Sequence, residues 1–308
     1  MDGTTMISII LPVYNGQRLL RETLESVLDQ TYTSFEVVAI DDGSTDNSLE
    51  VLRAYENDIV VHSQKNCGVA ATRNSGVQLA RGDLIAFLDQ DDIWYPFKLE
   101  KQIELFQSST DVSFVYSDFD LIDSQSRITQ KCALSIMKAD WMRPFIGGHL
   151  HPYPSTVLMK KSLFMDVGGF DPEFIENTDE DIDLWVRVYD KVPFHFIPEA
   201  LVQYRRDHQH QMKKRRSFEV ESANFLHLYQ KLESRFRNDS SKKEAMDGLQ
   251  AVVLAGKGKA FAFHGEFKQA RDCFKKALEL APDNRRHKWR YLRTFLPVCF
   301  HRYIFPRK

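Results

Sequence analysis

The feature that most constrains the fold is a series of apolar segments that do not alternate with polar residues. These segments are residues 6–13, 35–40, 59–62 and 84–88. Strands of this kind are buried on both faces, as in a parallel sheet covered by helices. Segments with helical spacing separate them, at residues 18–30, 48–55 and 69–80. The order predicts an α/β fold, with a mostly parallel sheet flanked by helices and right-handed crossovers.

The rest of the chain predicts a second, smaller region. A helix at 96–108 and strands at 112–119, 155–159 and within 194–204 continue the sheet, with an amphipathic helix at 181–189. A basic stretch over residues 205–216 follows, and the pattern is then helical almost to the end. We therefore predict an α/β domain over residues 1–216 and a small all-α region over residues 217–308.

Composition narrows the class of protein. The 308 residues carry a net charge of −2, which argues against nucleic acid as the main partner. Four cysteines without CxxC spacing are typical of reduced thiols, so a zinc site has little support. We expect neither a signal peptide nor a membrane-spanning segment, because no apolar stretch has the required length or flanks. The sequence favours a cytoplasmic location.

An acidic turn follows the fourth apolar segment. Asp89-Gln90-Asp91-Asp92 directly follows residues 84–88. Three neighbouring carboxylates repel one another unless something offsets their charge, and hard cations such as Mg²⁺ or Mn²⁺ prefer carboxylate oxygens. Open α/β sheets also bind ligands beyond the carboxyl ends of their strands. The sequence therefore predicts a metal site here.

Two other strand ends and one helix start carry polar groups. Asp42 follows the second segment and suits hydrogen bonding to a base or ribose, although the same turn could simply join a strand to a helix. Tyr14 could stack on a base or be a buried aromatic residue. Arg73 could neutralise a phosphate or lie on a solvated helix face. Since parallel strands end at one edge, these groups together predict a nucleotide-diphosphate site.

These segments closely resemble glycosyltransferase family 2, whose members have the GT-A fold. The resemblance covers roughly residues 6–210, in family order. The matching segments are Ile9-Ile10-Leu11-Pro12-Val13-Tyr14-Asn15, Val38-Ala39-Ile40-Asp41-Asp42-Gly43-Ser44-Thr45-Asp46, Gly68 to Asn74, Phe87-Leu88-Asp89-Gln90-Asp91-Asp92-Ile93-Trp94, Gly168-Gly169-Phe170-Asp171 and Glu180-Asp181-Ile182-Asp183-Leu184-Trp185.

The resemblance implies inverting transfer of a sugar from a nucleotide-sugar, usually a UDP-sugar. By this resemblance, Pro12, Tyr14 and Asp42 would bind the nucleotide base and Asp89 would bind the ribose. Asp91 would bind the metal and Arg73 would lie near the phosphates. Asp181 would remove the proton from the acceptor. Glu180 and Trp185 are further substrate-site candidates, and Trp185 could instead orient Asp181. Without the resemblance, residues 180–183 would indicate only the usual acidic start of a helix.

The chemistry of sugar transfer also requires a carboxylate base and a means of stabilising the departing diphosphate. A sugar hydroxyl is a poor nucleophile, so a carboxylate must take its proton as it attacks. The departing diphosphate gains charge, which a metal stabilises. The chain departs from the family at the motif Tyr-Arg-x-His. Here one extra residue precedes the histidine, in the run Tyr204-Arg205-Arg206-Asp207-His208. His208 is therefore a candidate metal ligand on weaker grounds.

The helical region has its own pattern. Residues 251–284 match one tetratricopeptide-like unit, although an unrelated helical hairpin is the alternative. One such unit does not bury its own core, so the helices could pair with flanking helices, the α/β domain or a protein partner. The basic and aromatic residues 285–308 could rest peripherally on the inner face of a membrane or form a solvated cap.

The sequence leaves three alternative functions to compare. The first is an inverting, metal-dependent glycosyltransferase that acts on a hydroxyl of a glycan or lipid-linked acceptor in surface polysaccharide synthesis. The second is a nucleotidyltransferase acting on a sugar phosphate, which ranks lower because residues 13–18 contain one glycine rather than a glycine-rich basic loop. The third is a catalytically inactive nucleotide-binding scaffold, which the retention of every expected carboxylate argues against.

Overall fold

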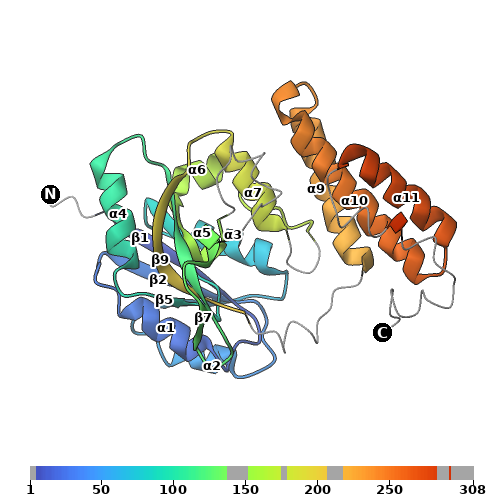
Figure 1. Ribbon diagram of the computed structural model, residues 1–308. Helices are drawn as coiled ribbons and strands as arrows, with labels where there is room; N and C mark the ends of the chain where they lie inside the picture. Colours follow the sequence, from blue (N-terminus) through green and yellow to red (C-terminus); the bar gives the residue numbers. More distant parts are fainter. Residues whose placement is uncertain (1–4, 137–151, 175–178, 207–217, 283–290, 293–308) are drawn as a thin grey trace. The chain divides into compact units, whose positions relative to one another are not determined.

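A computed structural model describes residues 5–136, 152–174, 179–206, 218–282 and 291–292 of the chain (Figure 1). The chain divides into two compact units, one with residues 1–173 and 180–213 and the other with residues 174–179 and 214–308. The first unit is α/β and the second is helical, as the sequence predicts. The predicted boundary between residues 216 and 217 lies outside the described residues and stays a prediction.

The first unit contains every strand of the described chain, with helices around one sheet (Figure 1). Its strands are β1 (Ile7–Val13), β2 (Phe35–Asp41), β3 (Val60–Ser63), β4 (Leu84–Phe87), β5 (Ile93–Trp94), β6 (Phe114–Ile122), β7 (Ile128–Gln130), β8 (Val157–Lys160) and β9 (His195–Arg205). Its helices are α1 (Leu20–Leu28), α2 (Ser48–Arg53), α3 (Val69–Leu79), α4 (Lys98–Ser108), α5 (Ala133–Ile136), α6 (Lys161–Asp166), α7 (Glu180–Tyr189) and a 3₁₀ turn at Pro154–Thr156.

The sheet has two halves of different character. Its order is β3-β2-β1-β4-β8-β6-β9-β5, with β7 paired to β6. We call β3, β2, β1 and β4 the parallel half, because each pairs in parallel with its neighbour. We call β8, β6, β9 and β5 the mixed half, because β8 is antiparallel to both β4 and β6, while β6 and β9 are parallel. The parallel half is therefore the part with the predicted crossovers.

Burial explains why the strands form where they do. Every residue of β1, β4 and β6 is buried, which accounts for the mainly apolar sequences of β1 and β4, while β6 also buries Ser117, Asp118 and Asp120. Aromatic rings extend this core between α6, α7 and the sheet, with Phe87 lying 5.2 Å from Phe170 and 5.7 Å from Phe164. Burying one such side chain contributes about 1.5–3 kcal/mol. This packing holds α7 beside the strands whose ends carry the acids.

The second unit is a set of packed helices, α9 (Phe218–Phe236), α10 (Lys243–Phe263) and α11 (Phe267–Leu280), with a short 3₁₀ turn at Ser240–Lys242. Gly258 of α10 lies against the ring of Phe274, and a Cβ there would come within 2.8 Å of it. The close approach makes α10 and α11 a tight hairpin over most of residues 251–284. Its assignment as a tetratricopeptide-like unit stays a prediction. Within the described residues, no helix combines the length and apolar character needed to span a membrane.

Candidate active site

The site is built at the carboxyl edge of the parallel half. β1 lies between β2 and β4, so the residues after these three strands meet at one edge. The ends of β1 and β4 are joined by two hydrogen bonds, because the Tyr14 N–H donates to Gln90 Oε1 at 2.8 Å and Gln90 Nε2 donates to the Tyr14 carbonyl at 3.1 Å. The Tyr14 side chain is 42% exposed, which leaves its ring available to a ligand.

Asp42 lies at the end of β2 and anchors the loop that leads into α3. Its Oδ1 accepts the N–H of Cys67 and its Oδ2 accepts the N–H of Gly68, each at 2.9 Å. Gln64 Nε2 also donates to Oδ1 at 2.9 Å. Gly68 has φ +88°, a left-handed conformation that favours glycine. Asp42 thus fixes the loop around residues 64–68 at this edge of the sheet. Its predicted contact with the nucleotide base stays a prediction.

The acidic turn after β4 gathers three carboxylates. Burial and repulsion from Asp89 raise the pKa of Asp91 to about 6. Burial, followed by repulsion from Asp91 and Asp89, raises the pKa of Asp92 well above its ordinary value. A divalent cation relieves this repulsion, and carboxylate oxygens are the ligands that Mg²⁺ and Mn²⁺ prefer. The chemistry of these oxygen donors therefore suits a hard cation.

Arg73 connects the acidic turn to α7. Its Nη2 donates to Asp89 Oδ1 at 2.6 Å and its Nη1 donates to Glu180 Oε1 at 2.8 Å. The guanidinium also lies 5.1 Å from the centre of the Phe170 ring, and the side chain is 4% exposed. Sequence reasoning offered a phosphate or a solvated helix face. The side chain is buried rather than solvated, and against the lowering effect of burial the charges of Asp89 and Glu180 raise its pKa. Its predicted contact with the phosphates stays a prediction.

This bridge places the acidic start of α7 next to the acidic turn. Burial, followed by the charge of Asp181, raises the pKa of Glu180 to about 7, against the lowering effect of Arg73. Among the described residues, Glu180 Oε2 and Arg73 Nε have no hydrogen-bond partner. Asp181 is partly exposed, unlike Glu180. Asp181 is therefore the member of this pair that is accessible for proton transfer.

Two further contacts fix the position of α7. Arg187 bonds Asp183 within the helix and donates from Nη2 to the Gly169 carbonyl at 2.7 Å. Asn74, next to Arg73 in α3, accepts from the Phe170 N–H at 3.0 Å and donates to its carbonyl at 2.8 Å. The segment around Gly169 and Phe170 is thus held from both α3 and α7.

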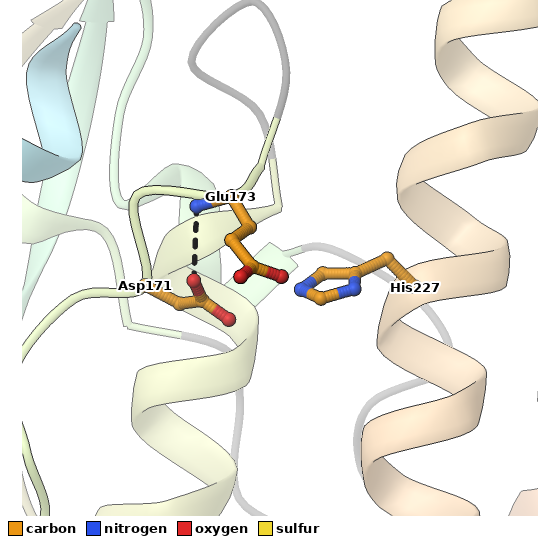
Figure 2. Close-up of side chains that lie close together, drawn as sticks. All are labelled: Asp171, Glu173 and His227. Carbon is orange, nitrogen blue, oxygen red and sulfur yellow. Dashed lines mark hydrogen bonds between the residues drawn. The ribbon is translucent and has the colours of Figure 1, made fainter. Parts of the chain in front are cut away.

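The chain continues from this segment into a tight turn. Figure 2 shows the N–H of Glu173 donating to Asp171 Oδ1, a bond of 2.9 Å. The side chain of Asp171 thereby caps the backbone two residues further along the chain, as aspartate often does in turns. This local bond directs the chain at the end of the matched Gly168 to Asp171 segment.

Three predicted residues need separate comment. Pro12 is buried within β1, opposite Ile40 in the register. Trp185 is fully buried, with its ring 5.2 Å from that of Phe114, so the described structure gives it a packing role in α7 rather than the predicted direct substrate contact. His208 lies outside the described residues, and its predicted role as a ligand is unchanged.

Two residues that sequence reasoning did not single out support the acidic turn. Ser155 Oγ accepts the Asp89 N–H at 3.0 Å and donates to Asp92 Oδ2 at 2.6 Å. Arg205 donates its own N–H to Asp92 Oδ1 at 3.0 Å and its Nε to the Asp91 carbonyl at 2.8 Å. Arg205 belongs to the Tyr204 to His208 run and Ser155 to the predicted strand at 155–159, but no sequence spacing shows that they meet this turn.

The fold is that of the GT-A glycosyltransferases. Residues 1–349 of Staphylococcus aureus TarS superpose with a TM-score of 0.64 at 17% identity, covering 94% of this chain and 89% of that one. The mannosyltransferase PcManGT of Pyrobaculum calidifontis, solved in complex with GDP-Man and Mn²⁺, superposes with a TM-score of 0.56 at 15% identity, covering 95% and 85%. At these identities the likeness shows the fold alone.

The sequence carries the comparison further. Residues 8–167 match the model of "Glycosyl transferase family 2", which is more than half of the chain. An uncharacterized glycosyltransferase of Rickettsia conorii is 29% identical over 278 residues, covering 87% of this chain and 44% of that protein. The chain therefore spans less than half the length of this relative. By the match to the family model, the present chain belongs to glycosyltransferase family 2.

Proposed function

We propose that the protein transfers a sugar with inversion from a nucleotide-sugar to a hydroxyl of a glycan or lipid-linked acceptor. The family resemblance favours a UDP-sugar as the donor. The observation that carries this proposal is the Arg73 bridge, which joins the acidic turn to the start of α7 through Asp89 and Glu180. The donor-binding edge and the start of α7, which carries the candidate base Asp181, are thereby joined through one guanidinium, and this proximity supports a single displacement.

Asp181 is the residue we assign to proton removal. Its carboxylate would accept the proton of the acceptor hydroxyl as that oxygen attacks the anomeric carbon. The bond from the anomeric carbon to the diphosphate oxygen breaks in the same step, and the nucleoside diphosphate leaves. No covalent enzyme intermediate is needed, and the anomeric centre inverts.

Asp91 is the residue we assign to the metal, with His208 as a second candidate ligand. A bound Mn²⁺ or Mg²⁺ would neutralise charge on the departing diphosphate. The raised pKa values of Asp91 and Asp92 support this assignment, because burial and the neighbouring carboxylates both disfavour an uncompensated negative charge in the turn. The Mn²⁺ in the complex of PcManGT also supports the use of a divalent cation.

The nucleotide would occupy the edge formed by β1, β2 and β4. We assign Pro12, Tyr14 and Asp42 to the base and Asp89 to the ribose. A complex of the same TarS fragment with UDP-GlcNAc supports a UDP-sugar as the first donor to test, and its TM-score with this chain is 0.59 at 16% identity. A role in surface polysaccharide synthesis, with a peripheral site at the inner face of the membrane, completes the proposal.

A donor screen tests the function. The protein is incubated with UDP-GlcNAc, UDP-Glc, UDP-Gal and GDP-Man, each with and without Mn²⁺, and thermal stability and nucleoside diphosphate release are measured. We expect one donor to stabilise the protein only with Mn²⁺ and to release its diphosphate. Pyrophosphate release from a nucleoside triphosphate and a sugar phosphate would instead favour a nucleotidyltransferase. Indifference to every donor would contradict the proposal.

A further inference from the structure

The acidic turn is held by side chains that do not themselves face a ligand. We infer that Arg205 is a positioning residue for the metal site, and that it sets cation affinity by fixing the backbone of Asp91 and the side chain of Asp92. This inference rests on the proposed function, because it takes the turn to be the cation site. Arg205 is the last residue of β9, in the mixed half.

Arg205 contacts the turn in two places. Its main-chain N–H donates to Asp92 Oδ1 at 3.0 Å, and its Nε donates to the carbonyl of Asp91 at 2.8 Å. The second oxygen of Asp92 accepts from Ser155 Oγ at 2.6 Å, and the same Oγ accepts the N–H of Asp89. Asp92 is 1% exposed, so its carboxylate links β9 to the turn and is not accessible as a metal ligand.

The remaining nitrogens of Arg205 are bound elsewhere. Nη1 donates to the Asp123 carbonyl at 2.8 Å. Nη2 donates to Glu22 Oε2 at 2.8 Å and to Ser126 Oγ at 3.1 Å. The side chain is 1% exposed, so the guanidinium is not directed at a phosphate in solvent. Nε thus bonds the turn, while Nη1 and Nη2 bond α1 and the segment between β6 and β7, so the side chain joins these three parts of the fold.

This geometry makes a specific prediction about affinity. A cation site needs its carboxylates held in place before the ion arrives, and partners that hold metal ligands typically change affinity by about 10–100-fold when removed. Lysine keeps the charge at position 205 but cannot make the forked set of bonds. Loss of the fork should therefore weaken cation binding even when the charge is retained.

The experiment compares the wild-type chain with Arg205→Lys and Arg205→Gln. Mn²⁺ binding is followed by electron paramagnetic resonance with UDP present, and transfer rates are measured against Mn²⁺ concentration. We expect the Mn²⁺ dissociation constant to rise by about tenfold in both variants. At saturating Mn²⁺ we expect kcat within about twofold of the wild type, because the chemical groups are intact.

Two further variants make the result decisive. Glu22→Gln loosens the guanidinium from its far side, at a side chain that is 43% exposed, and should raise the Mn²⁺ dissociation constant by a smaller factor. Arg81→Lys alters a 69% exposed arginine paired with Glu36 and should leave it unchanged. If the wild type binds Mn²⁺ and both Arg205 variants bind it equally well, this inference is wrong while the proposed function stands. If the wild type binds no Mn²⁺ with UDP, both fail.

Discussion

The two halves of the sheet contribute different groups to the site. The parallel half ends in the residues that we assign to the donor and the metal, including Tyr14, Asp42 and Asp91. Residues at the ends of the mixed half hold those groups, since Arg205 is the last residue of β9 and Ser155 lies in the 3₁₀ turn that leads into β8. Chemistry and support are thus drawn from strands of different topology, and a variant in each half should have a distinguishable effect.

The largest effect is expected at the candidate base. Asp181→Asn removes the proton acceptor and should lower kcat by about 10³-fold, within the usual range for general bases. Donor affinity should stay unchanged, because Asparagine preserves the size of the side chain. Initial rates and calorimetric titration with UDP and Mn²⁺ measure the two quantities. Transfer at the wild-type rate would remove Asp181 from the mechanism.

A support residue in the mixed half should act on the metal instead. Ser155→Ala removes the hydroxyl that bonds both Asp89 and Asp92. We expect Mn²⁺ affinity to fall by about tenfold, with a stability loss of about 1–3 kcal/mol from the unpaired groups. Ser108→Ala, at an exposed hydroxyl on α4, is the matched control. Equal Mn²⁺ affinity in Ser155→Ala and the control would show that the two halves do not divide the work in this way.

Stability should also depend on pH through Glu180. Its pKa is raised from 4.5 to about 7, so the folded protein keeps a proton that the unfolded chain has released between these values. By linkage, this group's contribution to stability is present below pH 4.5 and is lost as the pH rises through about 7. Glu180→Gln removes that loss.

Thermal melts of metal-free protein between about pH 5 and about pH 8 measure the effect. Between these pH values, the Tm of Glu180→Gln should fall by about 2–4 °C less than the Tm of the wild type, which corresponds to about 1 kcal/mol. Glu56→Gln, at an exposed residue, is the control and should follow the wild type. A Glu180→Gln profile parallel to the wild type would mean that Glu180 is ionised throughout this range.

The smallest effect is expected at the opposite edge of the parallel half. Arg81 pairs with Glu36, near the starts of β1 and β2, and its side chain is 69% exposed. The Glu36 carboxylate is 7% exposed, but it also accepts hydrogen bonds from Ser8 Oγ and the Arg81 N–H, and the solvated Arg81 side chain adds about 0–1 kcal/mol. Arg81→Gln should therefore change Tm only slightly and leave Mn²⁺ and donor affinity unchanged in the same titrations. A large loss of donor affinity would mean that the site is not confined to the carboxyl edge.

The same contrast explains what the sequence could predict. The parallel half was readable because each of β1, β2 and β4 is almost wholly buried and so appears as an unbroken apolar run. The two-residue strand β5 and the largely exposed β7 carry no such signal. Local pattern thus identifies the buried strands β1, β2 and β4 and misses β5 and β7, while the segment at 59–62 was predicted to be buried and forms the largely exposed edge strand β3.

The site divides in a similar way. The acids at the strand ends could be placed at one edge because parallel topology fixes where strands end. The partners of Arg73 could not, because Asp89 and Glu180 lie 16 and 107 residues away along the chain. Arg205 and Ser155 likewise reach the acidic turn only through the mixed half. Side-chain pairing over such separations depends on the assembled sheet, which no local spacing encodes.

The central claim is that Asp91 holds a cation that binds the diphosphate of the donor. The most direct measurement is the thermal shift produced by UDP in the presence and absence of Mn²⁺, for the wild type and Asp91→Asn. We expect Mn²⁺ to increase the stabilisation by UDP in the wild type, because a ligand that binds the folded state raises its stability. We expect no such increase in Asp91→Asn. An equal Mn²⁺-dependent shift in both proteins would contradict the account.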